Sequence, residues 1–130
     1  MSEPNGYQPS IYESIGGEEA LAAVVDDLYE RILADRHLAG FFAGAQMARL
    51  KGRQIEFFGQ ALGGPMVYTG ASIRRAHQGL GIEMEHFALV AGYLGDSLRA
   101  AGVPEGTISE IIGIVAPLAD DIVSSPVSAD

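Results

Sequence analysis

The chain has 130 residues, 48% of them apolar, and its formal net charge is −9 at pH 7. That length corresponds to one domain, and so acidic a chain is not expected to bind nucleic acid or an anionic membrane, because both repel negative charge. The sequence contains no cysteine, which excludes disulfides, thiolate nucleophiles and iron–sulfur clusters.

The N-terminal residues are polar and lack the apolar stretch of a signal peptide. No apolar run approaches the roughly 18 residues of a membrane span. A chain without cysteine suits a reducing compartment, so we expect a cytoplasmic protein. The expected organisation is a flexible tail over 1–10, one helical domain over 11–124 and a second tail over 125–130.

Helical patterns follow one another along this domain, and no segment alternates apolar and polar residues as a strand would. The predicted fold class is therefore all-α. Helices are expected at 10–15, 18–34, 46–62, 83–101 and 104–123, with about two further helical turns over 73–78.

The helix expected over 18–34 has the clearest amphipathic pattern. Its apolar residues recur at three- and four-residue intervals and should form one buried stripe, namely Leu21, Val24, Val25, Leu28, Tyr29 and Ile32. The same spacing predicts stripes in the next two long helices, made of Met47, Leu50, Gln54, Phe57, Phe58, Ala61 and Leu62, and of Met84, Phe87, Val90, Ala91, Leu94 and Leu98. Between the first two helices, the adjacent Phe41 and Phe42 are expected to plug the core.

Proline and glycine interrupt several of the expected helices. Pro117 lies inside the last one, where its ring should clash with the carbonyl of Gly113, and we expect a kink rather than a break. Glycines inside helices each cost about 1 kcal/mol relative to alanine. Either another backbone or a large flat ligand approaches them closely, or a loosely packed protein tolerates them; they are Gly52, Gly59, Gly92 and Gly95.

Two polar side chains lie in the predicted apolar stripes. Tyr29 belongs to the buried face of 18–34 and Gln54 to that of 46–62, where a polar group without a hydrogen-bond partner is costly to bury. They either satisfy each other or nearby carbonyl groups, as most buried polar groups do, or they point at a polar ligand inside an apolar pocket.

The glycine-bounded stretch over 63–81 contains the histidine that is best placed to be a ligand. His77 shares a helix face with Ile73, whereas His37 is expected to be solvated and His86 half exposed. With no cysteine and no second well-placed histidine, a zinc or di-iron site made by protein side chains alone is not expected. Haem needs fewer protein ligands, because it supplies four nitrogens and requires one axial imidazole. No nucleophile elbow, P-loop or dinucleotide-binding fingerprint occurs in the sequence.

Several short segments between Ile11 and Val123 are individually weak signals and specific in combination. They are Ile11-Tyr12 and Gly16-Gly17; Tyr29, Ala34-Asp35 and Phe41-Phe42; Leu50-Lys51-Gly52, Gln54, Phe57 and Phe58; Gly63-Gly64-Pro65 and Tyr68-Thr69-Gly70; His77-Gln78-Gly79; and Ala101-Gly102-Val103-Pro104. In this order and at this spacing the chain resembles a group I truncated haemoglobin, the short globin in which two helices lie over two others.

The resemblance implies one non-covalent haem b. His77 would be the proximal ligand of the iron, and Tyr29 would donate a hydrogen bond to bound O2 with Gln54 as its distal partner. Phe58 would gate an apolar ligand tunnel. The other haem contacts would be Phe42, Leu50 and Phe87, with Arg53, Tyr68 and Arg74 at the propionates.

The implied ligands are O2, nitric oxide and other diatomic molecules. The first hypothesis is tight O2 binding with oxidation of nitric oxide to nitrate, which requires an unidentified reductase. The alternatives are a non-catalytic oxygen carrier, store or gas sensor, and a haem-free helical interaction module. Some family members have a basic N-terminal extension implicated in fast nitric oxide turnover, whereas Glu3 is the one charged residue of this tail. We expect a monomer or a weak homodimer.

Overall fold

The computed structural model describes residues 9–68, 77 and 80–123, and these residues form helices and connecting loops without any strand. The predicted all-α class is confirmed. The helices are α1 (Ile11–Ile15), α2 (Gly17–Leu33), α3 (Met47–Ala61), α5 (Met84–Ala100), α6 (Glu105–Val115) and α7 (Ala119–Ile122), and the 3-10 turns are η1 (Ala39–Phe42) and η2 (Ala116–Leu118).

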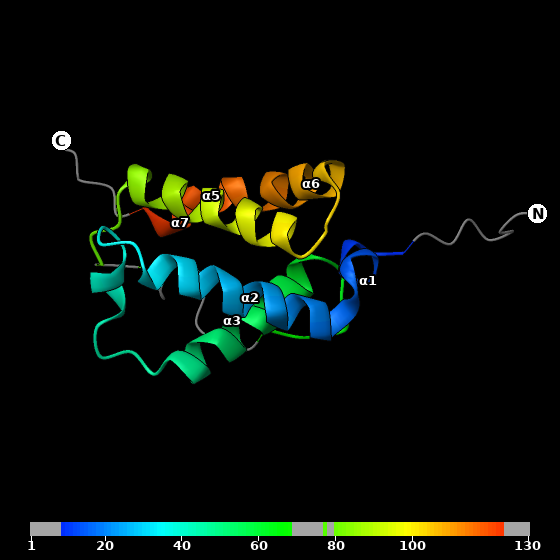
Figure 1. Cartoon of the computed structure of the whole chain (residues 1–130), viewed down its shortest axis with the longest axis horizontal. Coiled ribbons are helices and arrows are strands. Elements are labelled where there is room, and N and C mark those ends of the chain that lie inside the picture. Colours follow the sequence, from blue (N-terminus) through cyan, green and yellow to red (C-terminus); the bar gives the residue numbers. More distant parts are fainter. Residues whose placement is uncertain (1–8, 69–76, 78–79, 124–130) are drawn as a thin grey trace, which may run out of the picture.

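The helices lie in two layers (Figure 1). α2 packs on α3 in one layer and α5 packs on α6 in the other, while α2 also packs on α5 and so joins the layers through one core. α1 packs on α2 and closes the end at which α2 begins, and η1 lies at the opposite end. This is the two-over-two arrangement that the sequence predicts.

α2 is the central element of the core. Every residue of its predicted stripe is buried, namely Leu21, Val24, Val25, Leu28, Tyr29 and Ile32. The second layer contributes Leu94 and Leu98 from α5 and Ile108, Ile111 and Val115 from α6. Full burial of one such aliphatic side chain stabilises the fold by about 1.5–3 kcal/mol, so this α2-centred cluster accounts for much of what holds the layers together.

α3 and the start of α5 are less completely covered. Leu50, Gln54, Phe57 and Phe58 of the predicted α3 stripe are half-buried, and Ala61 is exposed. Met84, the first residue of α5, is 58% exposed. The prediction of burial was wrong for Ala61 and Met84, because periodicity identifies the residues that share a face but not whether another element covers that face.

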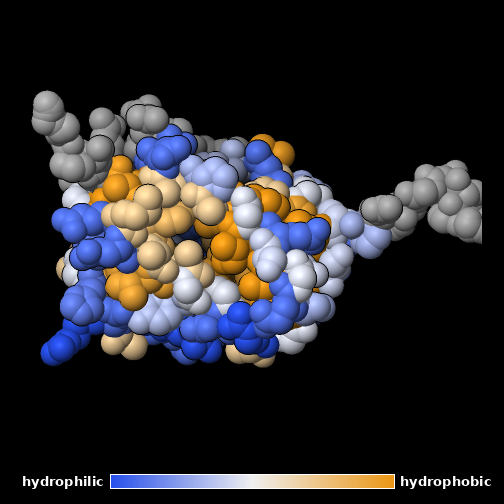
Figure 2. All heavy atoms as spheres, turned by 90° about the horizontal axis from the view of Figure 1, so that it is seen from above, coloured by the Kyte–Doolittle hydropathy of each residue, from blue (hydrophilic) through white to orange (hydrophobic). Residues whose placement is uncertain are grey.

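One face of the molecule carries an apolar patch. Figure 2 looks onto the layer of α5, α6 and α7, where apolar residues gather across the middle of the face and polar residues surround them.

Large exposed apolar side chains are concentrated in one connection. Among the large exposed apolar side chains, three belong to the connection between α3 and α5 or to its junction with α5, namely Val67, Leu80 and Met84. This connection also carries His77. No helix in the described ranges is long and apolar enough to cross a membrane.

A glycine pair ends α3 against α1, as predicted. The Tyr12 N–H donates a hydrogen bond to the Leu62 carbonyl at 2.9 Å. Gly63 adopts a left-handed backbone with φ of 90°, which glycine reaches without strain. A Cβ at Gly64 would lie 2.7 Å from the Tyr12 ring. Any side chain at that position would therefore push α1 away from α3.

The single helix predicted over 104–123 is divided into three pieces. α6 ends at Val115, η2 contains Pro117, and α7 follows. Because Pro117 has no N–H, the Gly113 carbonyl loses its helical hydrogen bond at this point, and a tighter 3-10 turn replaces the α-helical one. The prediction of one kinked helix without a break was therefore wrong, because a 3-10 turn separates α6 from α7.

The glycines inside helices have different environments. A Cβ at Gly59 would overlap the Sδ of Met66, whereas no described atom lies within 4 Å of a Cβ built at Gly52 or Gly92. At Gly95 the nearest atom, from Ile108, is at an ordinary 3.9 Å. Close approach of a neighbour therefore explains Gly59, whereas the described residues leave open space beside Gly52 and Gly92 and an ordinary contact beside Gly95.

Candidate functional site

Tyr29 is a buried polar residue without a polar partner. Its side chain is 6% exposed, and its ring packs edge-to-face on Phe42 of η1, with centroids 5.6 Å apart and planes at 84°. Within the described residues its hydroxyl forms no hydrogen bond. Burial raises the pKa of Tyr29, so the hydroxyl keeps its proton and remains a hydrogen-bond donor.

α3 presents a mixed apolar and amide face to the same region. Leu50, Gln54 and Phe58 recur every four residues, so they share one side of the helix, and all three are half-buried. Gln54, like Tyr29, makes no hydrogen bond within the described part of the chain. The two side chains therefore do not form a hydrogen bond with each other.

Half-buried apolar side chains complete this region. Phe42 of η1, Leu50 and Phe58 of α3 and Phe87 of α5 all pack against the main core while keeping part of their surface uncovered. A pocket with apolar walls and a few polar groups is the usual construction of a small-molecule site.

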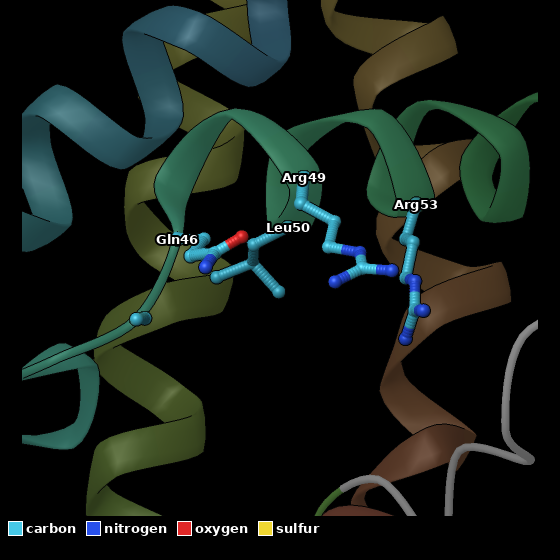
Figure 3. A pocket seen from close by; sticks show the side chains of 5 residues that line it. Gln46, Arg49, Leu50 and Arg53 are labelled. Atoms are coloured by element: carbon cyan, nitrogen blue, oxygen red, sulfur yellow. The ribbon is translucent and has the colours of Figure 1, made fainter.

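A hollow of about 310 Å³ runs along α3 beside Leu50, and its lining consists of Ala45, Gln46, Arg49, Leu50 and Arg53. Figure 3 shows the labelled side chains extending from one side of the helix toward this space. Arg49 and Arg53 are exposed and form no ion pair with the described residues. Paired guanidinium groups at an apolar floor suit a flat apolar molecule with carboxylates at its edge.

Sequence reasoning identified Arg53 but missed Arg49. The four-residue spacing between the two places both on one side of α3, and that spacing was the available signal. Gln46 and Leu50 have the same spacing, so the four residues form two adjacent pairs around the hollow.

Tyr68 follows α3 and folds back onto it. Its ring lies edge-to-face with Phe57 at a centroid distance of 5.5 Å, and its N–H donates to the Gln60 side-chain oxygen at 2.6 Å. Phe57 is four residues after Arg53 and shares its side of the helix. The structure thus brings Tyr68 to the side of α3 that carries the arginines.

His77 is helical and half-buried. The Leu80 N–H donates a hydrogen bond to the His77 carbonyl at 3.4 Å, and Gly81, with φ of 75°, lies shortly before α5. Ile73 and Arg74 lie outside the described residues.

The other two histidines line a hollow of their own. His37 is exposed and His86 half-buried, as expected, and both line a second hollow of about 460 Å³. No group of three or more histidine, aspartate or glutamate side chains in the described ranges is arranged to hold a metal ion.

The family model of the bacterial-like globins matches residues 10–124. The group 1 truncated hemoglobin GlbN of Mycolicibacterium paratuberculosis is 61% identical over 113 residues, which cover 87% of this chain and 83% of that protein. Among solved structures, the truncated hemoglobin of Tetrahymena pyriformis in its Fe(III) form superposes with a TM-score of 0.86 at 31% identity, covering 90% of this chain and all of that one.

A second solved structure is the 2/2 hemoglobin of a Synechococcus species in the cyanomet state with covalently attached heme. It has a TM-score of 0.84 at 32% identity and covers 88% of this chain and 98% of that one. The chain therefore belongs to the bacterial-like globin family. A globin binds haem and, through it, diatomic ligands such as O2.

The described residues fit such a cofactor. Tyr29, a buried residue, offers a hydroxyl donor without a partner among the described residues, and His77 is half-buried and carries an imidazole. Arg49 and Arg53 offer cations for propionates beside the apolar Leu50. The incomplete burial of the α3 stripe, which periodicity alone did not anticipate, is what a protein with space for a flat apolar group should show.

Proposed function

We propose that this globin binds one non-covalent haem b, holds O2 tightly through Tyr29 and Gln54, and oxidises nitric oxide to nitrate. Haem supplies the iron to which the diatomic ligand binds. The observation that carries the proposal is that the buried residue Tyr29 has a protonated hydroxyl without a polar partner among the described residues.

The distal pair accounts for tight binding. A donor aimed at a ligand that gains negative charge acts as an oxyanion-hole donor does, and a hydrogen bond to a charged group is worth about 1.5–3 kcal/mol. Phe42 fixes the Tyr29 ring from one side. Gln54 comes from the facing helix α3, so the two donors can approach the ligand from different directions.

The remaining residues of the site hold the cofactor in this proposal. His77 would hold the iron through its imidazole. Arg53, Arg74 and Tyr68 bind the propionates, and Arg49 joins them because it lines the same hollow as Arg53. Leu50, Phe58 and Phe87 form apolar walls. Phe58 also gates ligand entry.

The absorption spectrum of the purified protein tests the cofactor. We expect a Soret band that shifts on reduction with dithionite and again on exposure to oxygen. A chain that stays colourless after addition of hemin contradicts the proposal and leaves a haem-free interaction module. Acid extraction into organic solvent should remove all haem, since the chain has no cysteine for a thioether bond; haem that remains attached contradicts the non-covalent form.

Rapid mixing of the oxygenated protein with nitric oxide tests the activity. Repeated turnover requires a reductase, because nothing in the chain returns the iron to its ferrous state. We expect stoichiometric nitrate over many cycles with a ferredoxin or flavin reductase present. One cycle followed by arrest, even with the reductase, assigns the site to oxygen storage, transport or sensing instead. We place this activity in the cytoplasm, in a domain over 11–124 that is a monomer or a weak homodimer.

A further inference from the structure

The segment from Asp35 to Phe42, which leads from α2 to the end of η1, is held against α5 near both of its ends. The Tyr93 hydroxyl donates to Asp35 Oδ2 at 2.5 Å. The Phe41 ring lies edge-to-face with the His86 imidazole, with centroids 5.0 Å apart. Tyr93 and His86 are seven residues apart, so they lie on one side of α5 two turns from each other.

Asp35 joins α5 to the turn after α2. Its second carboxylate oxygen, Oδ1, accepts the His37 N–H at 2.7 Å, and its backbone carbonyl accepts the N–H groups of Leu38 and Ala39 at 3.0 and 2.9 Å. The hydrogen bonds from Tyr93 and then from the His37 backbone lower the pKa of Asp35. The carboxylate is therefore ionised, and its bond to Tyr93 is charge-assisted.

The position of this segment affects the Tyr29 ring through Phe42. Phe42 follows Phe41 directly and packs on the Tyr29 ring. Since the Tyr29 hydroxyl has no polar partner within the described residues, the packing around its ring is what directs it. A shift of η1 along α5 would move Phe42 and, with it, the direction in which Tyr29 donates.

We propose that Tyr93 and Asp35 are positioning residues for the distal donor Tyr29, acting through η1 and Phe42. This inference rests on the proposed function, in which Tyr29 donates to the ligand. Neither residue is in the ligand pocket, and the pairing joins positions 58 apart in the sequence.

The test uses haem-loaded Tyr93→Phe, which removes the hydroxyl and keeps the ring. We expect the O2 dissociation rate to rise roughly threefold to tenfold, the range that substitutions without ligand contact produce. The iron–CO and C–O vibrational frequencies of the CO complex, which report the field at the ligand, should shift in the direction seen for Tyr29→Phe, and by less. Asp35→Asn, in a chain that keeps Tyr93, should retain much of the wild-type value of both readouts, because an amide can accept from the His37 N–H and donate to the Tyr93 oxygen.

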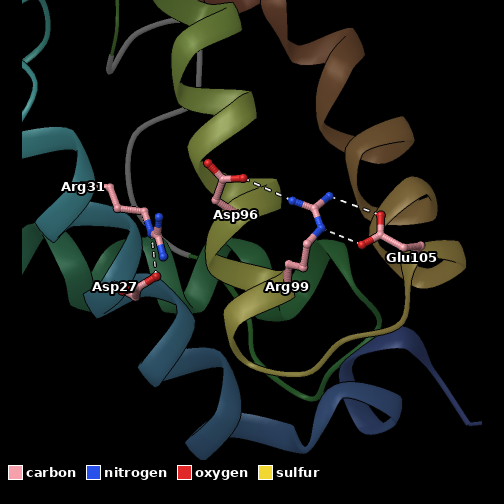
Figure 4. A network of polar contacts seen from close by, with 5 residues as sticks. All are labelled: Asp27, Arg31, Asp96, Arg99 and Glu105. Atoms are coloured by element: carbon pink, nitrogen blue, oxygen red, sulfur yellow. Dashed lines mark hydrogen bonds and ion pairs between the residues drawn. The ribbon is translucent and has the colours of Figure 1, made fainter.

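Arg99→Gln is the matched control. Arg99 donates to Glu105 at 2.5 and 3.1 Å and to Asp96 at 3.1 Å at the other end of α5 (Figure 4). That variant removes a side-chain bond as short as the one from Tyr93 to Asp35. It should change the melting temperature without changing the O2 dissociation rate or the CO frequencies.

The outcomes separate this inference from the proposed function. If Tyr29→Phe alters both readouts while Tyr93→Phe matches Arg99→Gln, the positioning role is overturned and the distal donor stands. If Tyr29→Phe alters neither, both are overturned. Should Tyr93→Phe fail to hold haem, Asp35→Ala gives the same test, and wild-type frequencies in that variant overturn the inference. If both single variants fold, a double variant of Tyr93 and Asp35 whose O2 dissociation rate is no faster than that of either single variant supports the inference.

Discussion

The charged side chains at the corner between α5 and α6, and those of α2 nearby, are paired within the protein (Figure 4). Arg99 bridges Asp96 and Glu105, and Arg31 on α2 donates to Asp27 at 2.8 Å. Within the described residues, Tyr29 and Gln54 form no hydrogen bond, and Arg49 and Arg53, which line the hollow beside α3, form no ion pair. Both regions are built on the same few helices, so the difference does not arise from the fold.

The contrast separates polar groups that are paired within the protein from those that are candidates to contact a ligand. Exposed opposite charges that form an ion pair stabilise each other only weakly in water, so removing one pair changes the free energy of unfolding little. Polar groups held beside apolar walls without partners are costly in the protein alone. They are retained where another molecule completes their hydrogen bonds. The predictions below test this contrast, beginning with the largest effect.

His77→Ala should remove the haem completely. The axial imidazole is the one protein bond to the iron in the proposed site, so we expect no Soret band after gel filtration of the hemin-treated variant. His37→Ala, which alters an exposed histidine, should retain the band. A variant at position 77 with the wild-type spectrum would remove His77 as ligand.

Removal of haem should lower stability markedly. A ligand that binds the folded state alone stabilises it by about 4 kcal/mol when present at a thousand times its dissociation constant. Thermal melts of the apo and haem-loaded protein should therefore be well separated. Coincident melts would mean that the half-buried faces of α3 and α5 do not need the cofactor.

Tyr29→Phe should raise the O2 dissociation rate about tenfold to a hundredfold, which corresponds to the roughly 1.5–3 kcal/mol of a charge-assisted hydrogen bond. Because the hydroxyl has no partner among the described residues, the melting temperature of the apo protein should stay the same or rise. Stopped-flow displacement of O2 by CO measures the rate. A clear drop in apo stability would instead show that the hydroxyl has a structural partner.

Arg99→Gln should give the smallest effect, and one that depends on pH. The Arg99 guanidinium holds the pKa of the Glu105 carboxyl below its usual value of 4.5. A group whose pKa is lowered by folding stabilises the protein fully above its unfolded pKa, and the contribution disappears as pH falls through the folded value. The difference in melting temperature between wild type and variant should thus be present near neutral pH and shrink below about pH 4.5. A difference that persists unchanged into acid would contradict this origin.

The amino-acid sequence anticipated what depends on local spacing. The α2 stripe from Leu21 to Ile32 was predicted residue by residue, since helical periodicity and burial coincide where a helix is covered on one side. Tyr29 and Gln54 were found because each is a polar residue in an apolar stripe. The helix stop at Gly63 was also readable, because a left-handed backbone favours glycine.

Features that depend on distant parts of the chain were not readable. Nothing near Asp35 indicates Tyr93, since their bond exists once α2 and α5 pack together. In the sequence Arg49 is indistinguishable from any solvated arginine, and its position at the hollow beside α3 is visible only in the structure. Met84 fits the apolar pattern of α5, but the sequence does not indicate that no neighbouring element in the described ranges covers the start of this helix. The roles of His77 and of the other cofactor contacts stay predictions that the experiments above decide.

Gly59 has a consequence for the segment that leaves α3. The thioether of Met66 occupies the volume in which any other residue at position 59 would carry its Cβ atom. Gly59→Ala would therefore force the flexible end of the Met66 side chain to move away from α3, although neither residue lines the hollow beside that helix.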